Sequence, residues 1–213
     1  LKLLKSNFLS EKYALEDKII KYYPQRITSL ENRINGLKAD VETAKQHPKP
    51  TDDRFIGMEV KGVFYSEKAE AGKAIIKACK QMNSPDPIPL GKYRGFETEL
   101  LFNTTERNYE VRLKGATSRT VTLGDDANGN IIRLDNGIER FAESLSLAEN
   151  DLENTQNQLE TAMKEVQKPF IQEEELKTKL ARLDELNILL NMDKTENEIV
   201  GGEPDAVSYT HLR

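Results

Sequence analysis

Two stretches of this chain repeat apolar residues in alternating steps of three and four, which restricts both to helices that pair along one face. The first stretch carries Ile20, Tyr23, Ile27, Leu30, Ile34, Leu37, Val41 and Ala44. The second carries Ile138, Leu145, Leu152, Leu159 and Val166, then Leu176, Leu180, Leu183 and Leu190. Each stretch needs a second helix to cover its apolar face, and the other stretch can supply that helix. The spacing therefore predicts an antiparallel coiled coil.

Prolines divide both stretches. Pro24 and Pro169 predict a break in each arm, because proline lacks the N–H that a helix interior needs. We expect helices near 8–22 and 25–46 in a first arm over 1–50. We expect helices near 138–167 and 171–191 in a second arm over 137–200.

Charge is distributed unevenly among the three parts of the chain. Residues 1–50 hold 10 Lys/Arg and 6 Asp/Glu, a balance of +4, and residues 137–200 hold 7 against 15, a balance of −8. Residues 51–136 hold 13 of each sign. Opposite signs on two helical arms favour their pairing with each other. The alternative is that one seam pairs with a second copy or with another part of a longer protein.

The middle segment, 51–136, changes to a period of two. A hairpin is expected around Lys61 and Gly62, a helix over 67–82, and strands at 96–102, 109–113 and 120–123. Asn128-Gly129 predicts a tight turn. The fold class is therefore α+β: a small domain with an antiparallel sheet and one helix, inserted at the tip of an antiparallel helical coiled-coil stalk.

Chemistry-bearing residues are scarce in the sequence. The two histidines, His47 and His211, lie in a proline-rich helix exit and near the C-terminal end, and Cys79 lies on the apolar side of a predicted helix. Gly57 to Gly62 has the glycine spacing of a phosphate loop but lacks the Lys and Ser/Thr that must follow. Asp125 to Asn130 is better explained as a turn than as a calcium loop. We expect no catalytic residue, no metal and no cofactor, and hence not an enzyme.

Basic residues of the middle segment are the candidate nucleic-acid contacts. Lys73, Lys77 and Lys80 share one helix stripe, Arg112 and Lys114 share the outer sheet face with Arg119 expected nearby, and Lys92 and Arg94 flank Tyr93. If they converge, they could bind phosphates while Tyr93 stacks on a base. The alternative is an ordinary solvated surface, since the segment carries equal numbers of positive and negative residues.

The sequence also predicts the location of the chain and the nature of its two ends. The sequence has a single cysteine, no apolar run of membrane-spanning length and no recognisable signal peptide. We therefore expect a cytoplasmic chain without a membrane partner. The first residue is Leu rather than Met, so the natural start is expected to lie upstream. Residues 201–213 are expected to form a disordered tail, in which 206–213 resembles translated sequencing-adapter sequence.

Several runs of residues are similar to one family. They are Leu9–Lys18, Tyr23–Ile27, Pro89–Phe96 and Ala181–Asn191, in this order over about residues 1–205. Together they resemble the C-terminal region of very large helicase and DNA methyltransferase proteins carried by bacterial conjugative elements and phages.

The resemblance implies a parent with a superfamily-two helicase core, often beside an adenine-specific DNA methylase, and a role in element maintenance or antirestriction. No ATP-binding or methylase motif of such parents matches here, so no active-site residue is carried over. The implied function is a non-catalytic accessory region that positions DNA or a partner relative to the motor. The implied partners are the rest of the parent chain and DNA. A purely structural spacer or dimerisation arm remains the alternative.

Overall fold

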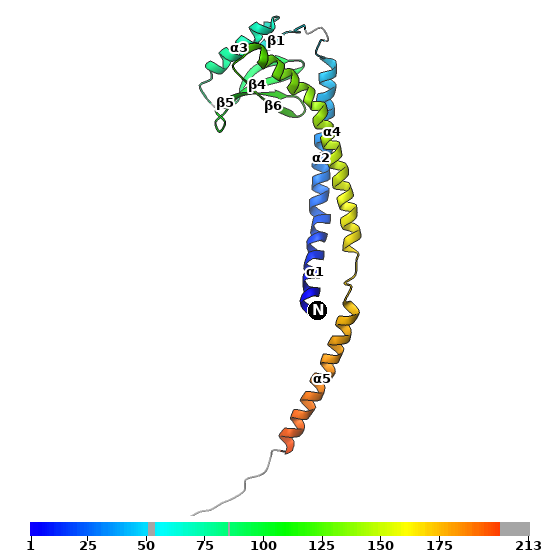
Figure 1. The fold of residues 1–213 in the computed structure, drawn as a ribbon. Helices are drawn as coiled ribbons and strands as arrows, with labels where there is room; N and C mark the ends of the chain where they lie inside the picture. Colours follow the sequence, from blue (N-terminus) through cyan, green and yellow to red (C-terminus); the bar gives the residue numbers. More distant parts are fainter. Residues whose placement is uncertain (51–53, 85, 201–213) are drawn as a thin grey trace, which may run out of the picture. The chain divides into compact units, whose positions relative to one another are not determined.

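A computed structural model describes the backbone of residues 1–50, 54–84 and 86–200 and the side chains of these residues up to Asn191. Figure 1 shows the elements in chain order. They are α1 (Lys2–Asp17), the π-helical turn η1 (Lys18–Tyr22), α2 (Tyr23–Gln46), β1 (Met58–Val60), β2 (Val63–Tyr65), α3 (Lys68–Lys80), β3 (Ile88–Tyr93), β4 (Phe96–Asn103), β5 (Asn108–Lys114), β6 (Ser118–Thr122), α4 (Ala127–Val166) and α5 (Glu173–Val200).

The chain forms two compact units. One contains residues 19–161, and the other contains residues 1–18 with the chain from Ala162 onward. The first unit holds the whole sheet together with α2, α3 and most of α4.

All strands of the first unit join one antiparallel sheet in the order β2-β1-β3-β4-β5-β6. The α+β fold class and the antiparallel sheet are confirmed, and the hairpin predicted around Lys61 and Gly62 belongs to the same sheet as the other strands. The hairpin joins them because β1 pairs with β3, with Glu59 opposite Lys92 and Val60 opposite Gly91. A Cβ atom at Gly91 would lie 1.9 Å from the carbonyl oxygen of Glu59, so this junction requires glycine.

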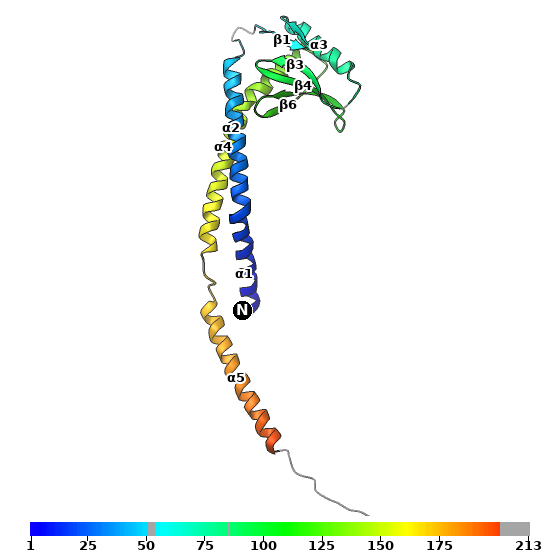
Figure 2. The ribbon, with the colours of Figure 1, turned by 180° about the vertical axis from the view of Figure 1, so that it is seen from behind.

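Helices α3 and the first part of α4 cover one face of the sheet (Figure 2). The core beneath them contains Met58, Val60, Ala71, Ile75, Leu90, Phe96, Leu100, Val111, Leu113, Ile131, Leu134, Ile138 and Phe141. The rings of Phe96 and Phe141 stack with centroids 5.1 Å apart, which joins the sheet to α4.

The start of α4 corrects the sequence analysis in two respects. The helix begins at Ala127 instead of 138, and Asn128-Gly129 lies in its first turn instead of forming a tight turn between strands. Asp126 caps the helix by accepting a hydrogen bond from the Gly129 N–H. The helical spacing of Ile131, Leu134 and Ile138 then buries one face of α4 on the sheet. The first 11 residues of α4 therefore belong to the core of the sheet domain.

Helices α2 and α4 run antiparallel and lie side by side where they leave the sheet (Figures 1 and 2). Leu30, Ile34 and Leu37 of α2 are buried, as are Ala148 and Thr155 of α4. Lys38 and Glu149 form an ion pair of 3.5 Å between the two helices. Burial follows the predicted heptad positions only in part, since Ile20 is 71% exposed and Asp40, which lies between two heptad positions, is buried.

The two predicted breaks have different outcomes. Pro24 does not end the helix, because it lies in the first turn of α2, where proline's missing N–H is tolerated. The irregularity is the π-helical turn η1 just before it, and α1 begins at Lys2 instead of near residue 8. At Pro169 the break is confirmed, since α4 ends at Val166 and α5 begins at Glu173.

In the second unit, α1 contacts the break between α4 and α5. The rings of Phe8 and Phe170 lie 5.5 Å apart, and Lys5 forms a 2.7 Å ion pair with Glu173. Leu176 is buried beside them, whereas every side chain from Ala181 to Asn191 is exposed. The predicted disordered tail, 201–213, lies outside the described residues.

No helix within the described residues is both long enough and apolar enough to cross a bilayer.

Candidate nucleic-acid interface

The basic residues selected from the sequence lie on three different surfaces. Lys73, Lys77 and Lys80 form the expected exposed stripe on α3. Lys73 forms an ion pair of 2.8 Å with Glu70 on the same helix. Because α3 covers one face of the sheet, this stripe cannot act together with residues on the other face.

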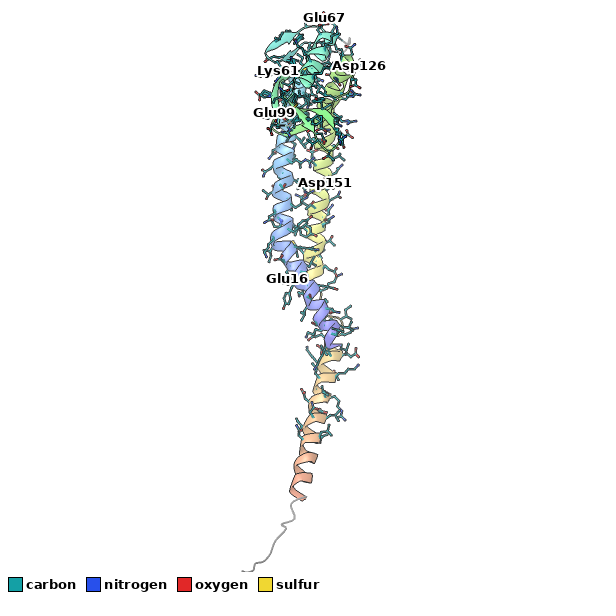
Figure 3. All side chains as sticks on the ribbon, turned by 90° about the vertical axis from the view of Figure 1, so that its left-hand side faces the viewer. Glu16, Lys61, Glu67, Glu99, Asp126 and Asp151 are labelled. Atoms are coloured by element: carbon teal, nitrogen blue, oxygen red, sulfur yellow. The ribbon has the colours of Figure 1, made fainter. Side chains whose placement is uncertain are left out.

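Lys92, Arg112 and Lys114 lie on the uncovered face of the sheet, among carboxylates. One cross-strand row reads Glu59, Lys92, Glu97 and Lys114, with each residue opposite the next. In the neighbouring row Glu99 accepts ion pairs from Lys114 at 2.8 Å and Arg112 at 3.4 Å. Figure 3 shows Glu99 on the opposite side of the sheet domain from Asp126. Signs alternate across this face, so it has no concentrated positive charge to attract a phosphate backbone.

Tyr93 and Arg94 are buried, which corrects the expectation that Tyr93 is free to stack on a base and that Arg94 is free to meet a phosphate. The Arg94 side chain is 2% exposed and donates to Asp135 at 3.1 Å, to Glu139 at 2.8 Å and to the His47 carbonyl at 2.9 Å. The Tyr93 hydroxyl donates to the same Asp135 oxygen at 2.8 Å. These bonds hold the β3–β4 turn against α4 and the end of α2.

The environment of Tyr93 also keeps its hydroxyl protonated. Burial raises the pKa of Tyr93 well above its usual value, and the charge of Asp135 and the hydrogen bond to it raise the pKa further, while Arg94 opposes the shift. The hydroxyl thus serves as a fixed hydrogen-bond donor.

Arg119 lies on the covered face of the sheet instead of beside Arg112 and Lys114. It pairs with Leu113, which faces the core, and residues opposite each other in a sheet point to the same face. The expectation that Arg119 extends the outer basic surface is therefore wrong. Arg119 instead lines a groove on the covered side of the sheet.

A groove of about 310 Å³ lies between β6 and α4 and is rich in arginine. Its lining contains Arg119, Thr120, Val121, Thr122, Arg133, Asn136, Gly137 and Arg140. Arg33 of α2 is close enough for its charge to lower the pKa of Arg119. We call Arg33, Arg119, Arg133 and Arg140 the arginine cluster.

Two members of the arginine cluster are held in place by the fold. The Arg119 guanidinium donates to the Arg140 carbonyl at 3.2 Å and to the Ser144 hydroxyl, and lies 5.7 Å from the centre of the Phe141 ring. Arg133 donates to Asn130 at 3.1 Å. Because these side chains are already ordered, less rotamer entropy is lost when an anion binds.

Electrostatics at the arginine cluster favour an added negative charge. Burial lowers the pKa of Arg119, and the positive charges of Arg140 and Arg33 lower the pKa further, while Glu143 opposes the shift. Within the side chains that the structure describes, no carboxylate forms an ion pair with any of the four arginines. A phosphate would relieve their mutual repulsion.

The sequence contains one signal for this site. Arg133 and Arg140 are seven residues apart, which places them on one helical face. With a turn expected at Asn128-Gly129 and a helix expected only from 138, Arg133 lies outside the predicted helix. Arg33 could be added only from the tertiary structure.

A second, larger cleft of about 700 Å³ lies between the end of α2 and α4. Apolar side chains dominate its wall, and its polar groups are Lys45, Lys49, Glu139 and the already paired Arg94. Among the described residues, no three His, Cys, Asp or Glu side chains gather so that they could hold a metal ion.

Comparison of the chain with protein-family models, with curated proteins and with solved structures finds no match.

Proposed function

We propose that this chain is a non-catalytic, cytoplasmic accessory region of a large helicase and DNA methyltransferase of a mobile genetic element, and that it positions DNA relative to the motor. The observation that supports DNA contact is the arginine cluster: three arginines line one groove, the fourth acts on Arg119 through its charge, and none of the four forms an ion pair with a carboxylate among the described side chains. The sequence resemblance supports the parent protein.

The proposal includes a coiled-coil stalk formed by α2 and α4, with the sheet domain at its tip. Its support is the burial of Leu30, Ile34 and Leu37 at heptad positions of α2, and of Ala148 and Thr155 in α4, three residues after the heptad positions Leu145 and Leu152. Because α4 also contributes Ile131 and Leu134 to the sheet core, the stalk helix and the tip share one rigid element.

Two variants of equal charge change test the DNA contact. Replacing Arg33, Arg133 and Arg140 together by alanine removes three cations from the arginine cluster, and replacing Lys73, Lys77 and Lys80 removes three from α3. We expect the first variant to lose at least about tenfold in affinity for DNA in fluorescence anisotropy at low salt, and the second to lose less than about twofold. Equal losses in the two variants would contradict the assignment.

The alternative is a spacer or dimerisation arm without DNA contact. It is favoured by α5, where the apolar side chains of Leu183, Leu186, Leu189 and Leu190 are exposed. Sedimentation equilibrium separates the two proposals. A stable dimer that dissociates when Leu183 and Leu190 are changed to serine, in a chain that does not bind DNA, would support the alternative.

A further inference from the structure

The arginine cluster is small, and its surroundings restrict what can occupy it. We infer that it binds the phosphates of one nucleic-acid strand, without a second strand and without contact to the bases. This inference rests on the proposed function and names the form of nucleic acid that the site accepts.

The first argument is the extent of the positive charge. Three of the arginines line one groove of about 310 Å³, and the fourth lies close enough to act electrostatically on Arg119. The other basic surfaces do not extend it, since the α3 lysines project from a helix at the β1–β2 side of the sheet and the outer face is neutralised by carboxylates. The site can therefore neutralise about three or four phosphates of one strand.

The second argument is the negative charge around the groove. Asp125 and Asp126 follow Gly124, and a Cβ atom at Gly124 would lie 2.2 Å from the Arg133 guanidinium. Glu143 is close enough to raise the pKa of Arg119. A duplex places the phosphates of its second strand across a groove of the double helix, about 12 Å away in the major groove. A second strand brings more phosphates near these carboxylates than a single strand does, and like-charge contacts disfavour the duplex.

The third argument is the chemistry of the lining. No aromatic side chain of the described residues lines the groove, and Phe141, which lies beneath Arg119, is 1% exposed. Bases therefore have no ring on which to stack, although stacking is the usual source of base affinity for a single strand.

Fluorescence anisotropy with the full chain tests the inference. The probes are an oligothymidine strand, an abasic strand of the same length and a duplex with the same number of nucleotides per strand. We expect the two single strands to bind within about twofold of each other and the duplex to bind at least about tenfold more weakly. The plot of log affinity against log salt for the single strands should have a slope of about −2 to −3, which corresponds to three or four phosphates.

Variants connect that slope to the arginine cluster. Arg140→Ala should reduce the slope by about 0.7, and Lys114→Ala, on the outer face, should leave it unchanged. A duplex that binds as tightly as the single strand, or an abasic strand that binds about tenfold more weakly, would overturn the inference while leaving the proposed function intact. If no form of DNA binds at low salt, the proposed function fails together with the inference.

Discussion

Asp135 lies in a buried group of polar side chains in the sheet domain. One of its oxygens accepts from both Tyr93 and Arg94, and the Arg94 side chain has almost no access to water. When one partner of a buried ion pair is removed, the other charge stays buried without a counter-charge. The folded state is then destabilised by the cost of desolvating that charge.

We therefore expect Asp135→Asn to lower the free energy of unfolding by about 3 kcal/mol. Glu139→Gln is the matched control, since it removes a charge from the same arginine at a side chain that is 60% exposed, and it should cost less than about 1 kcal/mol. Urea unfolding followed by circular dichroism measures both changes. Equal effects of the two substitutions would show that burial does not decide the strength of these pairs.

Cys79 supplies a prediction about pH. Burial raises the pKa of its thiol to about 11, above the ordinary value of 9.0. Because the folded-state pKa exceeds the unfolded one, the contribution of the thiol to stability is complete below pH 9 and is lost as pH rises toward 11. Urea unfolding should show a decline in stability from pH 9 to pH 10 that Cys79→Ala reduces. An identical decline in the variant would contradict the assignment.

Asp40 shows a limit of sequence interpretation at the residue scale. It lies between two heptad positions, Leu37 and Val41, where the pattern places a solvent-facing residue. In the structure Asp40 is 1% exposed and accepts hydrogen bonds from the N–H groups of Ala116 at 2.6 Å and Thr117 at 2.8 Å. Its role depends on a turn 76 residues away, which no local pattern contains.

At the scale of elements, α3 and α4 approach each other closely because Gly72 has no side chain. A Cβ atom there would lie 2.1 Å from the carbonyl oxygen of Ala127, in the first turn of α4. This neighbour is backbone, so it cannot be relieved by a change of rotamer.

Gly72→Ala should accordingly destabilise the protein by about 2 kcal/mol, although alanine is the better helix former. Glu70→Ala, on the exposed side of α3, is the control and should change stability by less than about 0.5 kcal/mol. Thermal unfolding of the two variants gives the comparison. A Gly72→Ala variant as stable as the parent would mean that α3 and α4 can move apart freely.

The elements that sequence periodicity predicted well are those with one exposed and one buried face. Strands β4, β5 and β6 match the expected strands to within a few residues, because their side chains alternate between core and solvent. Strand β3 was not predicted, since Pro89 and Gly91 interrupt its pattern. Its backbone is extended because β1 and β4 pair with it on both sides.

The candidate site was less predictable than the elements. Lys73, Lys77 and Lys80 could be placed on one stripe from local spacing, and the structure agrees. Convergence of Arg33, Arg119 and Arg140 depends on how α2, β6 and α4 pack, and no local signal encodes that packing. The same limitation explains the error at Tyr93, since its burial requires α4 to begin eleven residues earlier than expected.

At the scale of the whole molecule, charge and apolar burial offer competing explanations for the pairing of the helical arms. The sequence gives the arms opposite net charge, and the structure shows an ion pair between Lys38 and Glu149, both about half exposed. Exposed pairs stabilise proteins by about 1 kcal/mol at most. Leu30, by contrast, is 2% exposed, and burial of one such side chain stabilises by about 1.5–3 kcal/mol.

Apolar burial should therefore dominate the pairing of α2 with α4. Leu30→Ala should lower the free energy of unfolding by about 2–4 kcal/mol. Lys38→Ala, or a rise in salt from about 50 mM to about 500 mM, should change it by less than about 1 kcal/mol, because screening acts only on the exposed charges. Urea unfolding of the parent and both variants at the two salt concentrations separates the contributions. If high salt destabilised the parent as strongly as Leu30→Ala does, and Lys38→Ala removed that sensitivity, charge would be the main source of pairing and the heptad seam a secondary one.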